Sequence, residues 1–303
     1  MAFLYWLESL RIPVLNEFML AVTYLGDEIA FLVVALILIW CADKRTGYYV
    51  LSVGFLGTIA NQFMKLWFRI PRPWVLDPQF TILEQAREGA SGYSFPSGHT
   101  QSSVGTFGAI AYITKNRVLR WICIAAVILV PFSRMYVGVH TPLDVGVAAI
   151  MAGALIFGLK PVILSKDHRV FPVFLGIMVA VSVGFLCFVE LYPFPADIDP
   201  HNMASGLKNA YTLLGSLLGL VIVYIVDEKW LHFPTIAIWG AQIIKVAVGL
   251  GLVLAVKSGL KTPLEAVFGA LVGRAVRYFL IVVTAGIVWP LSFRWFTKIG
   301  TKE

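Results

Sequence analysis

The stretch SRMYVGVHTPLD, residues 133–144, joins two long apolar runs of this chain. It places Arg134, His140 and Asp144 close together in a chain that is otherwise poor in charge. Thr141 and Pro142 are typical of the N-cap and the first position of a helix, and a carboxylate at the third position supports that start. The stretch therefore predicts a junction between two helices, with His140 just outside the second helix and Asp144 within reach of its ring.

The composition predicts an all-α, polytopic membrane protein. Hydrophobic residues make up 59% of the 303 residues, charged residues only 14%, and the mean hydropathy is +0.82. Soluble domains carry roughly 25% charged residues. The net charge of +7 does not favour nucleic acid, because the basic residues are scattered over short loops, as in cytoplasmic loops between spans. Cys41, Cys123 and Cys187 lie in or beside apolar runs and predict neither disulfides nor a metal site.

Apolar runs of the length needed to cross a bilayer, about 20 residues, recur along the chain. We predict an interfacial helix at residues 1–16 and nine spans near residues 18–40, 48–67, 99–114, 119–136, 142–160, 171–190, 207–226, 236–256 and 264–293. The basic segments are loops 43–46, 115–120 and 160–169 and the tail with Arg294, Lys298 and Lys302, whereas loop 190–201 is acidic. Basic loops stay in the cytoplasm, so the N-terminus is expected outside and the C-terminus inside.

This topology places six polar residues at span ends on the non-cytoplasmic face: Lys65, Arg72, His99, Arg134, His140 and Asp144. Residues without a shared role would scatter over both faces. Each cluster alone has an ordinary explanation, namely snorkelling side chains, a turn that caps a helix, or interface anchors. Their order and their common face favour one composite site.

The residue types predict a phosphate site. Guanidinium groups bind phosphoryl oxygens bidentately and a lysine adds a point charge, which Arg72, Arg134 and Lys65 would supply. Ser97 and Gly98 precede a predicted helix start, so their backbone amides can also face an anion, and glycine allows close approach.

Two histidines can divide the chemistry between them. One attacks phosphorus and the other protonates the leaving oxygen. The attacking histidine needs an orienting carboxylate, and Asp144 has the right spacing from His140. We therefore interpret His140 as the nucleophile, Asp144 as its orienting residue and His99 as the general acid. The chain offers no acidic cluster suited to Mg²⁺ or Ca²⁺, so we expect no metal and no cofactor.

Three motifs in this order resemble the type 2 phosphatidic acid phosphatase (PAP2) superfamily. They are Lys65 followed by Arg72-Pro73, then Pro96-Ser97-Gly98-His99, then Ser133-Arg134 followed by His140 and Asp144. The resemblance implies a phosphohistidine intermediate, no metal, and phosphate binding by Lys65, Arg72, Ser97, Gly98 and Arg134. It also implies a PAP2-like catalytic bundle of six helices, with its membrane core in residues 1–165. About three additional transmembrane helices of open role would follow in residues 166–303.

The C-terminal half contains cations within predicted spans, namely Lys245, Arg274 and Arg277. Charges at such depth usually face a cavity or a partner. One interpretation is a groove for an anionic lipid headgroup. The alternatives are pairing with Glu265 or Glu190, or a last span that begins later than residue 264.

The leading hypothesis is a metal-independent membrane phosphatase for a lipid phosphate or diphosphate, either phosphatidic acid-like or polyprenyl, acting at the non-cytoplasmic face. Its partners would be the lipid substrate and the bilayer, with no nucleic acid and an open oligomeric state. The compact loops favour a bacterial cell membrane. The alternatives are hydrolysis of a soluble ester such as glucose 6-phosphate, a haloperoxidase, which the spans disfavour, and a lipid transporter or scramblase, which the intact motifs disfavour.

Overall fold

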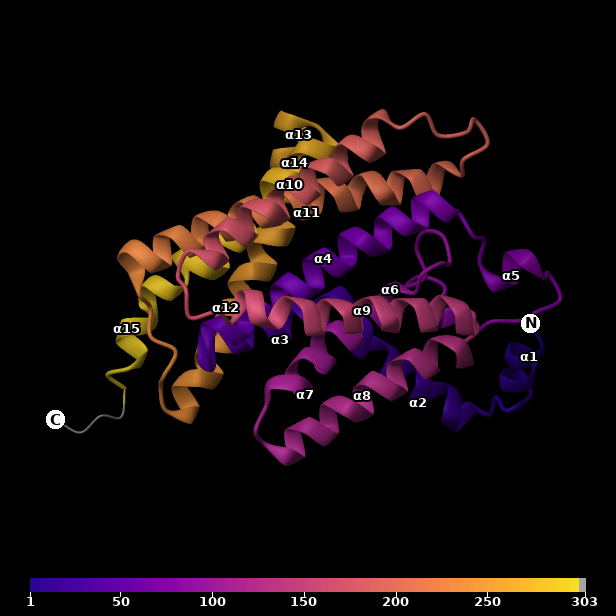
Figure 1. Cartoon of the computed structure of the whole chain (residues 1–303), viewed down its shortest axis with the longest axis horizontal. Helices are drawn as coiled ribbons and strands as arrows, with labels where there is room; N and C mark the ends of the chain where they lie inside the picture. Colours follow the sequence, from indigo (N-terminus) through magenta and orange to yellow (C-terminus); the bar gives the residue numbers. More distant parts are fainter. Residues whose placement is uncertain (300–303) are drawn as a thin grey trace. The chain divides into compact units, whose positions relative to one another are not determined.

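The computed structural model describes residues 1–299 and consists of helices and connecting loops, with no strand in that range (Figure 1). The predicted all-α class is therefore confirmed. Lys302 of the predicted basic tail lies outside the described residues.

Residues in contact divide the chain into two units that alternate along the sequence. Unit one comprises Met1–Leu32, Tyr49–Pro161 and Pro195–Gly206. Unit two comprises Val33–Tyr48, Val162–Phe194 and the described part of Leu207–Glu303. The predicted division at residue 165, between a catalytic core and additional helices, stays a prediction.

Unit one contains the helices around residues 133–144. Its elements are α1 (Ala2–Ser9), α2 (Pro13–Thr23), η1 (Tyr24–Gly26), most of α4 (Lys44–Phe68), α5 (Pro73–Leu76), η2 (Glu84–Ala86), α6 (Gly98–Ser103), the π-helical η3 (Val104–Gly108), α7 (Ala109–Ile113), α8 (Arg117–Tyr136) and α9 (Pro142–Ile163). Met19, Leu20, Tyr136, Val137 and Val139 share a buried core that fixes the end of α8.

The junction between α8 and α9 forms as the sequence predicts. Helix α9 begins at Pro142. The Thr141 N–H donates to Asp144 Oδ2 at 2.7 Å, and the Asp144 N–H donates to Thr141 Oγ1 at 3.3 Å. This reciprocal cap satisfies two amides at the helix start. Gly138 turns the chain with φ 89°, a backbone conformation that favours glycine.

Unit two consists of the C-terminal helices and one N-terminal helix. Its elements are most of α3 (Glu28–Cys41), α10 (Val170–Leu191), most of α11 (Pro200–Val226), η4 (Asp227–Leu231), α12 (Trp239–Gly259), α13 (Lys261–Phe268), α14 (Ala270–Val283), η5 (Thr284–Val288), η6 (Pro290–Ser292) and α15 (Phe293–Phe296). Helices α11 and α14 approach closely at Gly215, where a Cβ would lie 2.0 Å from the Ala275 carbonyl oxygen. Small residues permit such contacts between membrane helices.

Six helices of residues 1–299 are long and apolar enough to cross a membrane, and the bent pair Pro13–Gly26 and Glu28–Cys41 adds a seventh. Helix α4 has 25 residues, which is long enough, but Asn61, Gln62 and Lys65 make it more polar. The helical stretch from α6 to α7 is shorter than a full span. The nine-span topology therefore stays a prediction.

The last two predicted spans begin and end at different residues from those expected. The candidate span that corresponds to the predicted eighth runs from Trp239 to Phe268, and the one that corresponds to the predicted ninth runs from Ala270 to Phe296. Gly269, with φ 77°, separates them. The last candidate span therefore begins at Ala270, later than residue 264, because Gly269 has a conformation outside the helical region and ends the preceding helix.

Candidate active site

The predicted site residues of the three motifs all belong to unit one. Lys65 lies in the last turn of α4, Ser97 caps α6, Arg134 lies in the last turn of α8, and His140 precedes α9. The exposed fraction is 6% or less for Lys65, Arg72, Ser97, Arg134, His140 and Asp144. An apolar chain thus buries three cations around one histidine and one aspartate.

The His140 ring is held between a guanidinium and a carboxylate. Arg72 Nη1 lies 2.9 Å from His140 Nε2, and Asp144 Oδ2 lies 3.4 Å from His140 Nδ1. An arginine has donors only, so His140 Nε2 accepts and the ring proton of the neutral histidine is on Nδ1, facing Asp144. Burial, and then the charges of Arg72, Arg134 and Lys65, lower the pKa of His140 well below its usual value. The ring is therefore neutral, with a lone pair on Nε2.

Asp144 is itself held in place by two donors. Its Oδ2 accepts from the Ser94 hydroxyl at 2.6 Å and from the Thr141 N–H at 2.7 Å. The sequence did not single out Ser94 for this contact. A carboxylate fixed by two hydrogen bonds can orient the neighbouring imidazole without moving.

Arg72 is fixed by backbone oxygens on both sides of the site. It donates to the carbonyls of Ser91 at 2.9 Å, Gly92 at 3.1 Å and Val139 at 3.0 Å. Burial lowers its pKa to about 10, and Asp144 partly offsets this. Arg72 therefore keeps its positive charge near neutral pH.

Arg134 and Lys65 complete the group of cations. Arg134 Nη1 donates to Thr23 Oγ1 at 2.6 Å, while Arg134 Nε and Nη2 have no hydrogen-bond partner although the residue is 1% exposed. Lys65 Nζ donates to the Tyr93 carbonyl. Among these buried residues, three cations face one carboxylate, Asp144. Buried donors without partners are costly, so this arrangement is suited to receive an anion.

The start of α6 differs in detail from the sequence prediction. The Ser97 N–H donates to the Asp144 carbonyl at 3.1 Å, and the Ser97 hydroxyl accepts from the Thr100 hydroxyl at 3.0 Å. The Ser97 amide is therefore occupied within the protein. Gly98 follows it, and a Cβ there would meet only Asn61 Oδ1, at 3.7 Å.

His99 has a carboxylate partner that sequence reasoning did not assign. Its Nε2 lies 2.7 Å from Asp27 Oδ1. Asp27 and Thr23 both come from the turn between α2 and α3, and both contact a predicted site residue. The signal in the sequence is weak, because no local pattern around Asp27 indicates a distant histidine partner.

Lys245, Arg274 and Arg277 belong to unit two, where each contacts protein oxygen. Lys245 Nζ donates to the Trp40 carbonyl at 2.7 Å and to the Thr235 carbonyl at 3.2 Å, and the residue is fully buried. Arg274 Nε donates to Thr212 Oγ1 at 2.6 Å, and Arg277 Nη1 to the Lys257 carbonyl at 3.4 Å. Their role as headgroup contacts stays a prediction.

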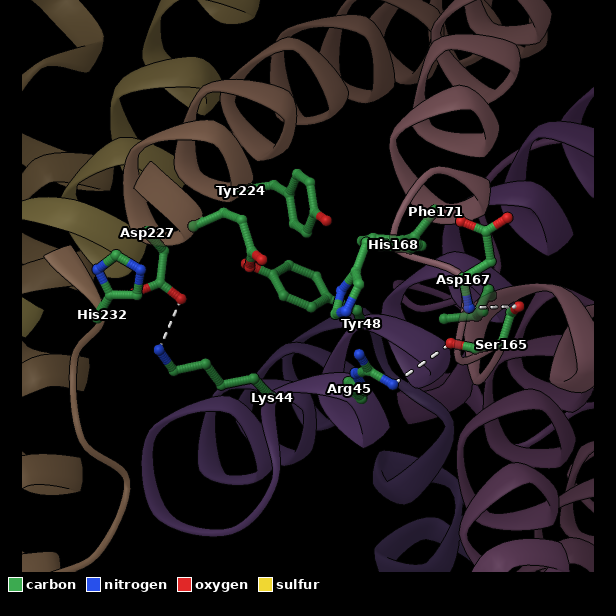
Figure 2. Close-up of a pocket in the computed structure, with 12 residues that line it drawn as sticks. Lys44, Arg45, Tyr48, Ser165, Asp167, His168, Phe171, Tyr224, Asp227 and His232 are labelled. Carbon is green, nitrogen blue, oxygen red and sulfur yellow. Dashed lines mark hydrogen bonds and ion pairs between the residues drawn. The ribbon is translucent and has the colours of Figure 1, made fainter. Parts of the chain in front are cut away.

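Unit two also contains a pocket of about 260 Å³, shown in Figure 2. Its charged side chains are Lys44, Arg45, Asp167, Asp227 and Glu228. The Lys44 ammonium faces Asp227 at 2.6 Å and lies 3.5 Å from the centre of the Phe233 ring. Arg45 Nη1 donates to the Ser165 carbonyl at 3.3 Å. The charges here are nearly balanced, and none of the three motifs contributes to the lining.

Within residues 1–299, no group of three or more histidine, cysteine, aspartate or glutamate residues is placed to hold a metal ion.

Comparisons with known proteins match both halves of the chain. Residues 45–166 match the family model of the PAP2 superfamily, and residues 211–302 match the model described as PAP2 superfamily phosphatase, transmembrane extension. No solved structure matches.

Three relatives are similar over about half of the chain. Undecaprenyl-diphosphatase BcrC of Bacillus subtilis is 33% identical over 48% of this chain and 74% of its own length. Phosphatidylglycerophosphatase B of the same organism is 30% identical over 49% of this chain and 74% of its own length. An undecaprenyl-diphosphatase of Sulfolobus acidocaldarius is 29% identical over 45% of this chain and 64% of its own length.

Proposed function

Because the chain belongs to the PAP2 superfamily and is a multi-pass membrane phosphatase, we propose that it hydrolyses a lipid phosphate or diphosphate through a phosphohistidine at His140. The substrate class is argued from its relatives, whose names give a polyprenyl diphosphate and phosphatidylglycerophosphate as substrates. A site at the ends of apolar helices also suits a substrate whose tail stays in the bilayer. We place the reaction at the non-cytoplasmic face, because the basic loops are expected in the cytoplasm and the site residues lie at the opposite ends of the predicted spans.

The observation that carries the proposal is the buried excess of positive charge around His140. Lys65, Arg72 and Arg134 are each at most 6% exposed, and Arg134 has two nitrogens without a partner. Burying like charges together costs free energy that the single buried carboxylate, Asp144, offsets only in part. A phosphoryl group with two negative charges would balance the cluster and satisfy the free guanidinium donors.

Gly98 supports the same conclusion, because packing within the protein does not explain a glycine at this position. Its neighbours leave room for a Cβ, at an ordinary contact distance of 3.7 Å from Asn61 Oδ1. Packing within the protein therefore does not require glycine here. A phosphate oxygen that approaches the Gly98 amide would require it.

The first chemical step transfers the phosphoryl group to His140. A phosphate oxygen takes the Arg72 donor that now lies on His140 Nε2, which frees the lone pair for attack on phosphorus. The N–P bond forms while the P–O bond to the alcohol or phosphate leaving group breaks, and His99 gives its proton to the departing oxygen. Asp144 stabilises the positive charge on His140, as the carboxylate does in other triads.

The second step regenerates the enzyme. His99, now neutral, takes a proton from water as the water oxygen attacks phosphorus. The N–P bond breaks, inorganic phosphate leaves, and His140 regains its lone pair. In both steps Lys65, Arg72 and Arg134 stabilise the charge on the equatorial oxygens, which is the role that a metal has in other phosphatases.

The test is release of phosphate from phosphatidic acid, a polyprenyl diphosphate and glucose 6-phosphate by purified protein, with and without EDTA. Release from either lipid, unchanged by EDTA and abolished by His140→Ala, is expected. A matched control is His168→Ala, which removes a histidine from the pocket in unit two. Release from glucose 6-phosphate alone would contradict the lipid assignment. Lipid translocation without hydrolysis would favour a transporter instead.

A further inference from the structure

The turn Thr23–Asp27 lies outside the part of the chain that matches the family models, which begins at residue 45. It separates two helical segments, Pro13–Gly26 and Glu28–Cys41, that meet at an angle of 53°. Asp27 is at the break, with an extended backbone at φ −70° and ψ 153°. The bend therefore directs one residue out of an apolar helix at the level of the candidate active site.

This turn is fitted closely to His99. Asp27 Oδ1 lies 2.7 Å from His99 Nε2, with side chains 35% and 13% exposed. Gly26 packs on the same residue, since a Cβ there would lie 2.9 Å from both His99 Cβ and its carbonyl oxygen. Thr23, at the other end of the turn, accepts a hydrogen bond from Arg134. Three residues of one turn thus contact two candidate site residues.

We propose that Asp27 is a positioning residue for His99, the second histidine–carboxylate pair of the site; this rests on the proposed function. With Nε2–H bound to Asp27, the Nδ1 nitrogen is left to exchange a proton with the leaving oxygen. His140 is oriented the other way, with Nδ1 towards Asp144 and Nε2 reactive. The two rings would be held by carboxylates through opposite nitrogens.

The charges around His99 give Asp27 a second effect. When His99 is protonated to act as an acid, it shares the site with the positive charges of Arg72 and Arg134. The Asp27 carboxylate offsets this repulsion. As the P–O bond breaks, the leaving oxygen takes the bonding electron pair and the Nδ1 proton, and neutral His99 stays bound to Asp27. The carboxylate itself gains no proton in this step.

The experiment compares Asp27→Asn with Glu28→Gln, a substitution at the adjacent, exposed carboxylate. Each is measured on two substrates, a lipid phosphate with an alkyl leaving group and p-nitrophenyl phosphate, whose leaving group departs without a proton. The ratio kcat/KM is used because it reports only the steps up to departure of the leaving group. Asn keeps the size of Asp, so the fold is disturbed little.

We expect Asp27→Asn to lower kcat/KM by on the order of 10²-fold for the alkyl phosphate, at the lower end of what general acids contribute. For p-nitrophenyl phosphate the loss should stay within about threefold, and Glu28→Gln should change neither substrate. Equal losses on both substrates would show a merely structural contact and overturn the proposal. No loss on either would overturn it as well.

The outcome is separable from the proposed function by including His140→Ala. If His140→Ala is inactive on both substrates while Asp27→Asn behaves as wild type, only the role of Asp27 fails. If His140→Ala stays active, the proposed function fails whatever Asp27→Asn does.

Discussion

The site in unit one and the pocket in unit two are both polar regions in an apolar chain, but their charges are arranged differently. In unit one, Lys65, Arg72 and Arg134 are buried together with one fully buried carboxylate, Asp144. In the pocket, Lys44 is paired with Asp227, and Asp167 and Glu228 outnumber the remaining cation, Arg45. One region needs an added anion to be neutral, and the other does not.

The difference shows what identifies a phosphate site in such a protein. The number of polar residues does not, since the pocket has as many as the site. Burial of a cation does not either, because Lys245 is fully buried on two backbone carbonyls. The identifying features are several cations without enough anions, a guanidinium with free donors, and a neutral histidine with its lone pair beside them.

The largest effect that separates the two regions should come from Arg134→Met compared with Lys44→Met. We expect Arg134→Met to lower kcat/KM by on the order of 10³-fold, as when donors to a transition-state oxyanion are lost. Thermal stability should stay the same or rise, because the substitution removes a like charge from a buried cluster. A large loss of stability in Arg134→Met would mean that the cluster is balanced within the protein, contrary to our comparison.

A smaller effect is expected for Gly98→Ala. The added methyl has room against Asn61 but would occupy the space of a phosphate oxygen. We predict a loss of about 10²-fold in kcat/KM, within the cost of displacing a reacting group, with an unchanged melting temperature. Gly146→Ala is the matched control, since a Cβ there meets nothing within 4 Å. Equal activities of the two variants would remove Gly98 from the site.

The pH dependence should distinguish the environment of His140 from that of an ordinary histidine. Burial and neighbouring cations lower the pKa of His140, so the ring stays neutral below pH 6.5, the usual value. The acid limb of kcat/KM should therefore lie below pH 6.5. An unshifted histidine would lower kcat/KM roughly tenfold at pH 5.5, and we expect the value to be several-fold higher than that. An acid limb at or above pH 6.5 would contradict this.

The same shift affects stability, and its sign follows from proton uptake. The unfolded chain protonates His140 near pH 6.5, whereas the folded protein does so only at lower pH. The unfolded state thus binds more protons below pH 6.5, so the folded state loses stability as the pH falls through this range. Unfolding midpoints at pH 7 and pH 5 measure this directly.

The smallest effect on activity is expected for Lys44→Met. In contrast to Arg134→Met, this substitution should lower stability and leave activity unchanged. Asp227 would keep its bond from the Phe233 N–H, at 3.1 Å, but lose its cation while 8% exposed. We expect about 2 kcal/mol of destabilisation, as for a buried charge that loses its partner, with kcat/KM unchanged within about twofold. Lost activity at full stability would instead place the pocket in the reaction.

Much of the site could be predicted because each motif depends on local chemistry. The cap formed by Thr141 and Asp144 depends on residues three apart, and it occurs as expected. The burial of Lys65, Arg72 and Arg134 in one unit agrees with the composite site that the three motifs predict. The helical class follows from composition alone.

The remainder depends on contacts between distant residues. Ser97 donates its amide to Asp144, which lies 47 positions away in the chain, and no pattern near Ser97 indicates this. Asp27 contacts His99 only because the chain bends between α2 and α3. The late start of the last span depends on the conformation of Gly269. Local periodicity cannot show where such a glycine interrupts a run of apolar residues.

The central claim is that His140 becomes phosphorylated, and trapping the intermediate tests it most directly. Radiolabelled substrate is mixed with the wild type, His99→Ala and His140→Ala, and each reaction is stopped in alkali, where phosphohistidine survives. We predict label on the peptide that contains His140, more of it in His99→Ala because hydrolysis of the intermediate is slowed, and none in His140→Ala. Label on another residue, or unchanged turnover in His140→Ala, would contradict the account.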